Sequence, residues 1–516
     1  MATLRHLLLI IATIVLSSSS YISTKEEEAI SWFKEYLRFK TAHPNPNYTA
    51  PVSFLIKQAN SIGLESKTLE FVPGKPVLLV TWPGSNPSLP CILFNSHLDS
   101  VPAEPDKWSH PPFSAFHSPD TGHIFARGAQ DDKCISIQYL EAIRNLKLVT
   151  NFEPTRTVHL LYVPEEEIGG FDGMAKFVDS DEFRDLNVGF VMDEGQASTT
   201  DEFRVFYADR SPWNLIIRAK GATAHGSRMF DNGATENLMK SIETITRFRD
   251  AQFDVVKAGK AADSEVISVN PVYLKSGIPS PTGFVMNMQP SEAEAGFDVR
   301  LPPTVDPDLV KRRIAEEWAP AARNMTYLSP FVKGRQILDA VLMENEVVEE
   351  CRKEKREGVV SKIDFEKAYD HVDWDFLNFV LEGKGLVDRA KGCQLVEGLN
   401  VGSDDIMIIE KGPIRDYQGR PLMTLTNDSN PWWPVFKYAI TAAGGKLQKP
   451  EILASTTDAR YMRQLGIPAF GFSPMSNTPI LLHDHNEFLN DRVFLRGIEV
   501  YESVISSLSS FVEPSH

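Results

Sequence analysis

The sequence predicts an α/β protein in which helices sandwich a mostly parallel β-sheet and a smaller α+β domain is inserted. Three observations lead to this prediction. Short, dense apolar runs alternate with stretches whose apolar residues recur at helical spacing. This alternation of strand-like and helix-like segments stops near residue 206 and resumes near residue 420. The length of 516 residues also allows more than one domain of ordinary size.

The larger domain is expected to occupy residues 24–206 and 420–516. Strands that are buried on both faces of a sheet read as continuous apolar runs. Such runs predict strands at residues 77–82, 91–94, 158–163 and 188–192. Helical spacing of apolar residues predicts helices over residues 26–38, 52–62, 131–146 and 432–443, and a last helix from Asn490.

The inserted domain is expected over residues 207–327 and 408–419. Its elements follow in the order β-α-β-β-α, which lacks only the final strand of a ferredoxin-like sandwich. They are predicted at residues 213–219, 235–248, 266–274, 293–300 and 307–318. We expect the final strand to be interrupted, with Met325–Tyr327 before the break and Ile408–Glu410 after it.

The composition excludes several classes of protein. Apolar residues make up 42% and charged residues 24% of the chain, which is ordinary for a folded, soluble protein and unlike a disordered, fibrous or polytopic membrane protein. The net charge of −16 argues against a nucleic-acid partner. Four scattered cysteines are too few for a disulfide scaffold.

The N-terminus has the pattern of a secretory signal. Arg5 precedes the apolar run Leu7–Leu16, which is too short to span a membrane, and four serines follow it. A signal peptide is therefore expected over residues 1–23. It would send the protein to the endoplasmic reticulum, the vacuole or the exterior; without it the protein would be cytoplasmic. Three glycosylation sequons agree with a secretory route, at Asn47, Asn324 and Asn427.

Histidines and carboxylates follow the predicted strands. Carboxylates at the ends of buried strands cost free energy unless a cation holds them. A mixed set of His, Asp and Glu without a thiolate suits zinc in a hydrolytic site, and a bridging carboxylate suits two metal ions. The candidates are His97, Asp99, Asp131, Glu166, Glu167, Glu194 and His483. Asp99 shares a face with His97 and is expected to hold its imidazole ring.

The segments around these residues resemble the aminoacylase branch of the di-zinc metallopeptidases, a family that also contains carboxypeptidases and dipeptidases. The resemblance covers residues 25–327 and 408–512, and it implies a zinc-peptidase-like fold with an inserted lid and dimerisation domain. It rests on FNSHLD (94–99), FARGAQD (125–131), PEEEIGG (164–170), MDEG (192–195), AHGSR (224–228), DSNPWW (428–433) and the GFSPM…LLHDH stretch that ends at His485.

The resemblance implies two Zn²⁺ ions per chain. His97 and Glu194 would bind one ion, Glu167 and His483 the other, and Asp131 would bridge them. Glu166 would be the general base, with Asp99 supporting the site.

It also implies residues that act on the substrate. His225 would stabilise the oxyanion in the active site of the other subunit of a homodimer formed through the lid. Residues that relatives use to bind substrate correspond to Asn287, Arg300, Thr457 and Arg460, and Arg300 or Arg460 would hold the free carboxylate.

A foreign insert is expected over residues 328–407. Residues 333–386 resemble the reverse transcriptase of plant non-LTR retrotransposons, and Asp364 matches its first catalytic aspartate. The paired aspartates of that enzyme are not recognisable, so polymerase activity is not expected. A retroelement fragment in the true transcript and an intron mistaken for an exon would both explain the insert, and we favour the intron.

The expected activity is zinc-dependent hydrolysis of N-acyl-L-amino acids to a carboxylate and a free L-amino acid. A dipeptidase or carboxypeptidase of the same family, or an inactive product of a disrupted gene model, are the alternatives. The expected partners are small N-acylated amino acids and a second copy of the chain, with no nucleic acid and no membrane beyond the signal segment.

Overall fold

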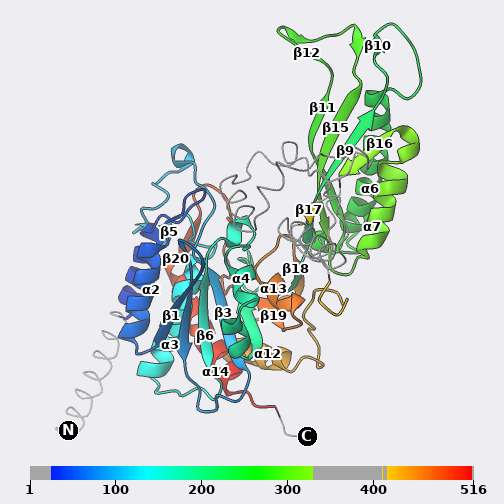
Figure 1. Ribbon diagram of the computed structural model, residues 1–516. Coiled ribbons are helices and arrows are strands. Elements are labelled where there is room, and N and C mark those ends of the chain that lie inside the picture. Colours follow the sequence, from blue (N-terminus) through cyan, green and yellow to red (C-terminus); the bar gives the residue numbers. More distant parts are fainter. Residues whose placement is uncertain (1–24, 329–408, 411–414, 514–516) are drawn as a thin grey trace, which may run out of the picture.

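The computed structural model describes residues 25–328, 409–410 and 415–513 (Figure 1). The predicted signal peptide lies outside the described residues, and so does the predicted insert apart from Leu328. The described chain forms a large domain and a small domain that stands beside it (Figure 1). The small domain is made from residues in the middle of the sequence, so it interrupts the large one.

The large domain is built on an eight-stranded sheet of order β1-β2-β6-β3-β7-β19-β8-β18. Its strands are β1 Glu65–Val72, β2 Lys75–Trp82, β3 Cys91–His97, β6 Val158–Val163, β7 Val188–Asp193, β8 Phe206–Asp209, β18 Glu451–Leu453 and β19 Ala469–Gly471. A second, three-stranded sheet of β4 Phe116–His117, β5 His123–Phe125 and β20 Phe488–Asn490 lies beside it.

The prediction of an α/β fold is confirmed, but the large sheet is mixed rather than mostly parallel. At the centre, strands β6, β3, β7 and β19 run parallel to one another, whereas β2 is antiparallel to β6. In contrast, β1 and β2 are antiparallel because only the short turn at Pro73 and Gly74 joins them, and β8 runs antiparallel to β19.

Two hydrophobic cores cover the two faces of the sheet. On β3, Ile92 and Phe94 belong to one core, and Leu93 to the other. Alternate residues of a strand point to opposite faces, so a strand buried on both sides must be apolar throughout. The helices of the first face are residues 25–38, α2 Thr49–Ser61, α3 Lys133–Leu148, α12 Trp432–Ala442 and α14 Asp491–Ser510, and those of the second are α4 Met174–Val178, α5 Asp181–Asp185 and α13 Ala459–Gln464.

The small domain has an antiparallel sheet of order β11-β15-β9-β16, with α6 and α7 packed on it (Figure 1). Its main elements are β9 Ser211–Lys220, α6 Ala234–Lys257, β11 Ser268–Ser276, β15 Glu292–Leu301, α7 Pro307–Arg313 and β16 Met325–Leu328. Because β8 still belongs to the large sheet, the domains meet between Asp209 and Ser211, a few residues later than the expected boundary at residue 206.

The interrupted strand of the small domain lies along β9 in two pieces. Leu328, the last residue of β16, pairs with Ile216, and Ile409, the first residue of β17 (Ile409–Glu410), pairs with Asn214. Only Leu215 separates the two partners. Both pieces therefore occupy one antiparallel register, in which a single residue opposite Leu215 would join them, and Leu328 belongs to the strand rather than to the insert.

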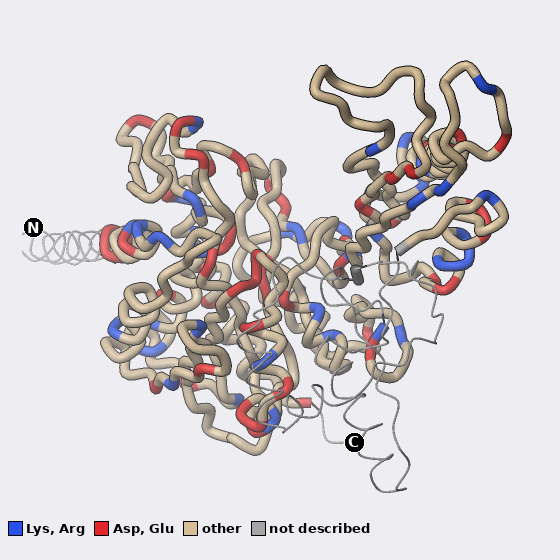
Figure 2. The backbone as a smooth tube through the Cα atoms, turned by 45° about the horizontal axis from the view of Figure 1, so that its top comes forward, with Lys and Arg blue, Asp and Glu red and all other residues tan. Residues whose placement is uncertain are grey.

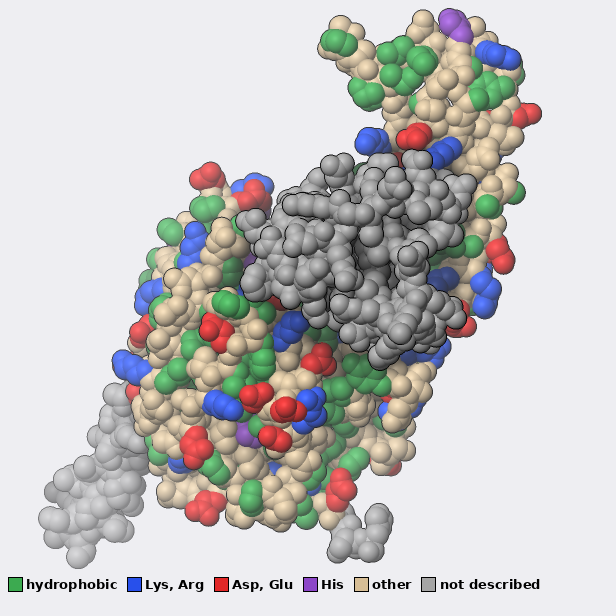
Figure 3. All heavy atoms as spheres, viewed as in Figure 1, with side chains coloured by type: hydrophobic (Ala, Val, Ile, Leu, Met, Phe, Trp, Pro, Cys, Tyr) green, Lys and Arg blue, Asp and Glu red, His purple; other side chains and the backbone are tan. Residues whose placement is uncertain are grey.

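The free end of the small domain exposes apolar side chains. Figure 3 shows such side chains gathered there, and Figure 2 shows few charged residues in the loops at this end. The exposed side chains of this domain include Met229, Val272, Leu274, Phe284 and Met286, of which Met286 is 89% exposed. In the described part of the chain, no helix is long and apolar enough to cross a membrane.

Candidate metal centre

The predicted ligands meet at the carboxyl ends of three neighbouring strands. His97 is the last residue of β3, Glu194 follows β7, and Glu167 lies in a short 3₁₀ turn, Glu166–Ile168, just after β6. Since β6, β3 and β7 are adjacent and parallel, their carboxyl ends lie side by side at one edge of the sheet, where α/β proteins bind ligands. Asp131 enters from the loop before α3.

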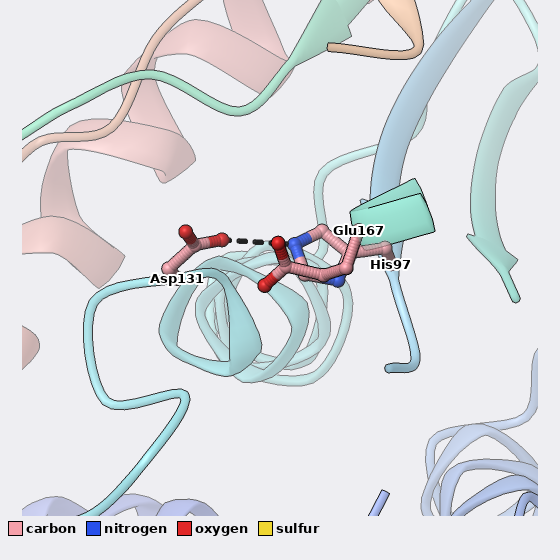
Figure 4. Close-up of side chains that lie close together, drawn as sticks. All are labelled: His97, Asp131 and Glu167. Atoms are coloured by element: carbon pink, nitrogen blue, oxygen red, sulfur yellow. Dashed lines mark hydrogen bonds and ion pairs between the residues drawn. The ribbon is translucent and has the colours of Figure 1, made fainter. Parts of the chain in front are cut away.

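The carboxylate of Asp131 lies between two histidines. Its Oδ1 is 3.0 Å from His97 Nε2, and its Oδ2 is 3.2 Å from His483 Nε2. His483 Nε2 is also 3.1 Å from Glu167 Oε2, while His97 Nε2 is 3.8 Å from Glu194 Oε2. Figure 4 shows His97, Asp131 and Glu167 turned toward one another. The structure thus brings all five predicted metal ligands into one cluster.

The chemistry of this cluster fits divalent cations. Burial raises the pKa of Glu194 and of Glu167, and the neighbouring Asp131 carboxylate raises both pKa values further. A bound dication would remove this repulsion. Two groups have ligand atoms within 4.8 Å of one another: His97, Asp131 and Glu167, and His97, Asp132 and Glu194. Imidazole and carboxylate ligands without a thiolate are typical of hydrolytic zinc sites.

A family model described as peptidase family M20/M25/M40 matches residues 93–507. The chain belongs to this family. It is 36% identical to aminoacylase-1 of Sus scrofa over 485 residues, which span 94% of this chain and 96% of that protein. It is 35% identical to human aminoacylase-1 over 487 residues, again 94% of this chain and 96% of the relative.

Solved M20 structures share the fold. The metallo-carboxypeptidase of Sulfolobus solfataricus superposes with a TM-score of 0.57 at 16% identity and covers 93% of this chain and 99% of its own. A dinuclear metal-binding M20 peptidase of Bacillus subtilis superposes with a TM-score of 0.51 at 13% identity, covering 94% of this chain and 99% of its own.

In this M20 chain, Asp99 supports the cluster of predicted ligands differently from the expectation. The His97 ring contacts the backbone oxygen of Asp99, with Nδ1 at 3.0 Å, whereas the carboxylate is 3.5 Å from that nitrogen. The carboxylate instead accepts hydrogen bonds from the backbone N–H groups of Glu166 and Glu167, both at 3.1 Å, and lies 2.8 Å from His43 Nε2. Asp99 therefore holds the turn that carries the predicted base and one ligand.

Sequence reasoning missed two carboxylates. Asp132 lies in the second ligand group, and its Oδ2 accepts the backbone N–H of His97 at 3.0 Å. In the sequence, the position of Asp132 directly after the predicted ligand Asp131 could have indicated this role. Glu487 is fully buried and accepts hydrogen bonds from Arg127 Nη1 at 2.8 Å and from the backbone N–H of Gln130 at 2.6 Å. It fixes the loop before Asp131, a role that no local pattern reveals.

The predicted substrate residues divide between the two domains. Arg460 is buried near the metal centre, where its Nη2 donates to the carbonyl oxygen of Gly169 at 2.6 Å. Thr457 lies just before α13, with its hydroxyl at 3.3 Å from the backbone nitrogen of Ala459. Arg300 lies at the end of β15 in the small domain, in a two-pronged ion pair with Asp298 at 2.6 and 2.8 Å.

His225 and Asn287 lie far from the metal centre of their own chain. The short strand β10, Ala224–His225, pairs with β14, Met288–Gln289, and Gly226 N–H donates to the carbonyl oxygen of Asn287. Figure 1 places β10 at the free end of the small domain. One chain therefore does not bring these two residues to the cluster.

Proposed function

We propose that this M20 protein hydrolyses N-acyl-L-amino acids to a carboxylate and a free L-amino acid with two zinc ions. The observation that carries the proposal is the Asp131 carboxylate between His97 and His483, in a chain related to aminoacylase-1 over 94% of its length. Asp131 would bridge the ions, His97 and Glu194 would complete the site of one, and Glu167 and His483 that of the other. His483 is 55% exposed, which leaves this side of the cluster open to a substrate.

When bound, the zinc pair supplies Lewis-acid stabilisation of the acyl oxygen and lowers the pKa of the attacking water. Glu166 accepts a proton from that water as the oxygen attacks the acyl carbon. It then delivers the proton to the amide nitrogen as the C–N bond breaks, so the products are an amine and a carboxylic acid, which loses its proton to the solvent and becomes a carboxylate. Burial raises the pKa of Glu166, and the nearby Asp458 carboxylate raises it further, which favours a carboxyl group that can hold the transferred proton.

We propose that the small domain acts as a lid and carries the interface of a homodimer. Support comes from the position of His225, which cannot complete the site of its own chain in this arrangement. The edge strand β11 also exposes Val272 and Leu274, at 68% and 64%. An apolar edge strand is a ready pairing surface for a second copy. A two-fold dimer would place His225 of one subunit at the metal centre of the other.

The carboxylate of the substrate would be held by Arg300. Its side chain is 29% exposed and can exchange Asp298 for a substrate carboxylate. Arg460 is buried and already holds the Gly169 carbonyl, so it supports the glutamate turn.

We propose that the protein enters the secretory route. In the fold, the asparagines of all three sequons, Asn47, Asn324 and Asn427, are exposed, as glycan acceptors must be.

The test is a substrate panel on the purified chain. N-acetyl-L-methionine, N-acetyl-D-methionine and the dipeptide Gly-Met are compared, and metal content is measured by mass spectrometry. We expect methionine to be released chiefly from the N-acetyl-L substrate. We also expect about two zinc ions per chain and loss of activity in a chelator. Faster cleavage of the dipeptide would favour the dipeptidase alternative. A metal-free chain that cleaves neither would show an inactive protein.

A further inference from the structure

The first of three consecutive glutamates, Glu165, has no role in the proposed mechanism, yet it begins the turn that carries Glu166 and Glu167. Its backbone has the left-handed conformation, with φ 69° and ψ 18°. This conformation is disfavoured for any residue with a side chain, and it persists where the surrounding contacts demand it. The backbone oxygen of Glu165 accepts the N–H groups of Ile168 and Gly170, at 3.3 and 2.7 Å, which closes the turn.

The side chain of Glu165 is held from two other elements. Its Oε1 accepts a hydrogen bond from the hydroxyl group of Tyr48 at 2.8 Å, and its Oε2 lies 2.9 Å from Lys75 Nζ. Tyr48 directly precedes α2, and Lys75 is the first residue of β2. The Glu165 side chain is only 5% exposed, so both of its oxygens lie away from bulk water and have found partners.

These contacts complete a frame around the turn. The Asp99 carboxylate holds the backbone N–H groups of Glu166 and Glu167, while Lys75 and Tyr48 hold the residue directly before them. A turn tied at both places cannot rotate, and rotation would move the proton-transfer carboxylate and a metal ligand together. Misplacement of reacting groups by about 1 Å can lower a rate by about a hundredfold.

We propose that Glu165, held by Lys75 and Tyr48, is a positioning residue that sets the orientation of Glu166 and Glu167. This proposal rests on the proposed function, because it assigns Glu165 an effect on the same hydrolytic site. Glu165 touches neither substrate nor metal and acts through the two residues that follow it.

Lys75 offers a matched control. Its Nζ also lies 2.6 Å from Asp172 Oδ2, but the side chain of Asp172 is 40% exposed. Exposed ion pairs are screened by water and contribute little, whereas removal of one partner from a buried pair leaves a charge without compensation. Asp172→Asn therefore removes an ion pair from the same lysine without changing the contacts of Glu165.

The experiment uses the full chain, loaded with zinc for kinetics and with cobalt for absorption spectra. Glu165→Gln and Lys75→Met are expected to lower kcat for N-acetyl-L-methionine by about tenfold to a hundredfold. KM should stay within about twofold, because substrate contacts are untouched. The cobalt absorption bands should shift, because they report the ligand geometry at Glu167. Lys75→Arg should recover most of kcat, and Asp172→Asn should match the wild type in both measurements.

The proposal is overturned if Glu165→Gln keeps the wild-type kcat and cobalt spectrum, or if only its melting temperature changes. If Glu165→Gln does not fold, Tyr48→Phe removes a single hydrogen bond to Glu165 Oε1, and an unchanged kcat and spectrum in that variant would overturn it equally. A wild-type chain that binds cobalt but does not cleave N-acetyl-L-methionine contradicts the proposed function alone. In that case the cobalt spectra still decide the role of Glu165.

Discussion

The Asp131 carboxylate reaches the imidazole of His483, 3.2 Å away, although the two residues come from the two separate stretches of the large domain. Its other oxygen faces His97. Because one carboxylate serves both halves of the cluster, Asp131→Asn should reduce metal content from about two ions to near zero, whereas His483→Ala should retain one. Metal analysis after gel filtration measures this. Two ions retained in Asp131→Asn would exclude a bridging role.

Substitutions of the neighbouring residues Glu166 and Glu167 should have different effects on metal content and on kcat. Glu166→Gln should keep both metals and lower kcat by about 10²- to 10⁴-fold, the range expected for lost general acid–base catalysis. Glu167→Gln should lose one metal, since its carboxylate lies 3.1 Å from His483 Nε2. Metal analysis and steady-state kinetics of both variants test this. Equal metal content and equal activity in the two would contradict the assignment.

A composite active site can be tested by complementation. Glu166→Gln and His225→Ala should each be nearly inactive alone. Each mixed dimer would contain one site with both intact residues, so the purified mixed dimers should have roughly half of the wild-type activity. Activity is measured after co-expression and purification through two different tags. Absence of recovery in verified mixed dimers would show that His225 acts within its own chain or not at all.

The register of β16 and β17 along β9 indicates which deletion should restore an unbroken strand in the small domain. Removal of residues 329–407 places Ile408 opposite Leu215 and continues β16 into β17 in the observed register. Removal of residues 328–407 joins Tyr327 to Ile408 and shifts the second half by one residue. A shift of one residue turns every following side chain to the other face of the sheet.

We expect the first deletion to raise solubility, dimerisation and kcat/KM above those of the full chain. The second should perform worse, although it differs by a single residue. Metal content should be similar in all three proteins because the ligands lie in the large domain. Soluble yield, light scattering, steady-state kinetics and metal analysis of the three proteins provide the comparison. Identical behaviour of the two deletions would show that this strand does not govern the small domain.

The buried His159 should make the folded protein less stable in acid. Burial on β6 lowers its pKa from 6.5 to about 4, so the unfolded chain binds more protons than the folded chain between these values. Stability is therefore full above pH 6.5 and falls as the pH drops toward 4, by about 3 kcal/mol from this group. His159→Asn can keep a hydrogen bond to Thr81 and has no charge to gain.

Urea unfolding of both proteins at pH 7 and pH 4.5 measures this effect. Other groups titrate in both proteins, so their contribution cancels in the difference. An equal fall in the free energy of unfolding for His159→Asn and the wild type would contradict the prediction.

Local sequence patterns were enough to predict the central strands of the sheet and the residues that could bind metal. The run from Cys91 to Phe94 had to be a strand covered on both faces, because alternate residues needed apolar partners on each side. Ligands placed after adjacent parallel strands had to meet at one edge of the sheet. Such inferences succeed because they depend on periodicity and on neighbouring residues.

The groups that support that cluster became known only from the folded arrangement of the chain. It turned the Asp99 carboxylate toward the amides of Glu166 and Glu167, tied Glu165 to Lys75, and buried Glu487 beside Gln130. It also placed His225 at the free end of the small domain, away from the ligands of its own chain. These contacts join residues far apart in the sequence, and their partners are selected by packing and by the need to satisfy buried polar groups, which no local pattern records.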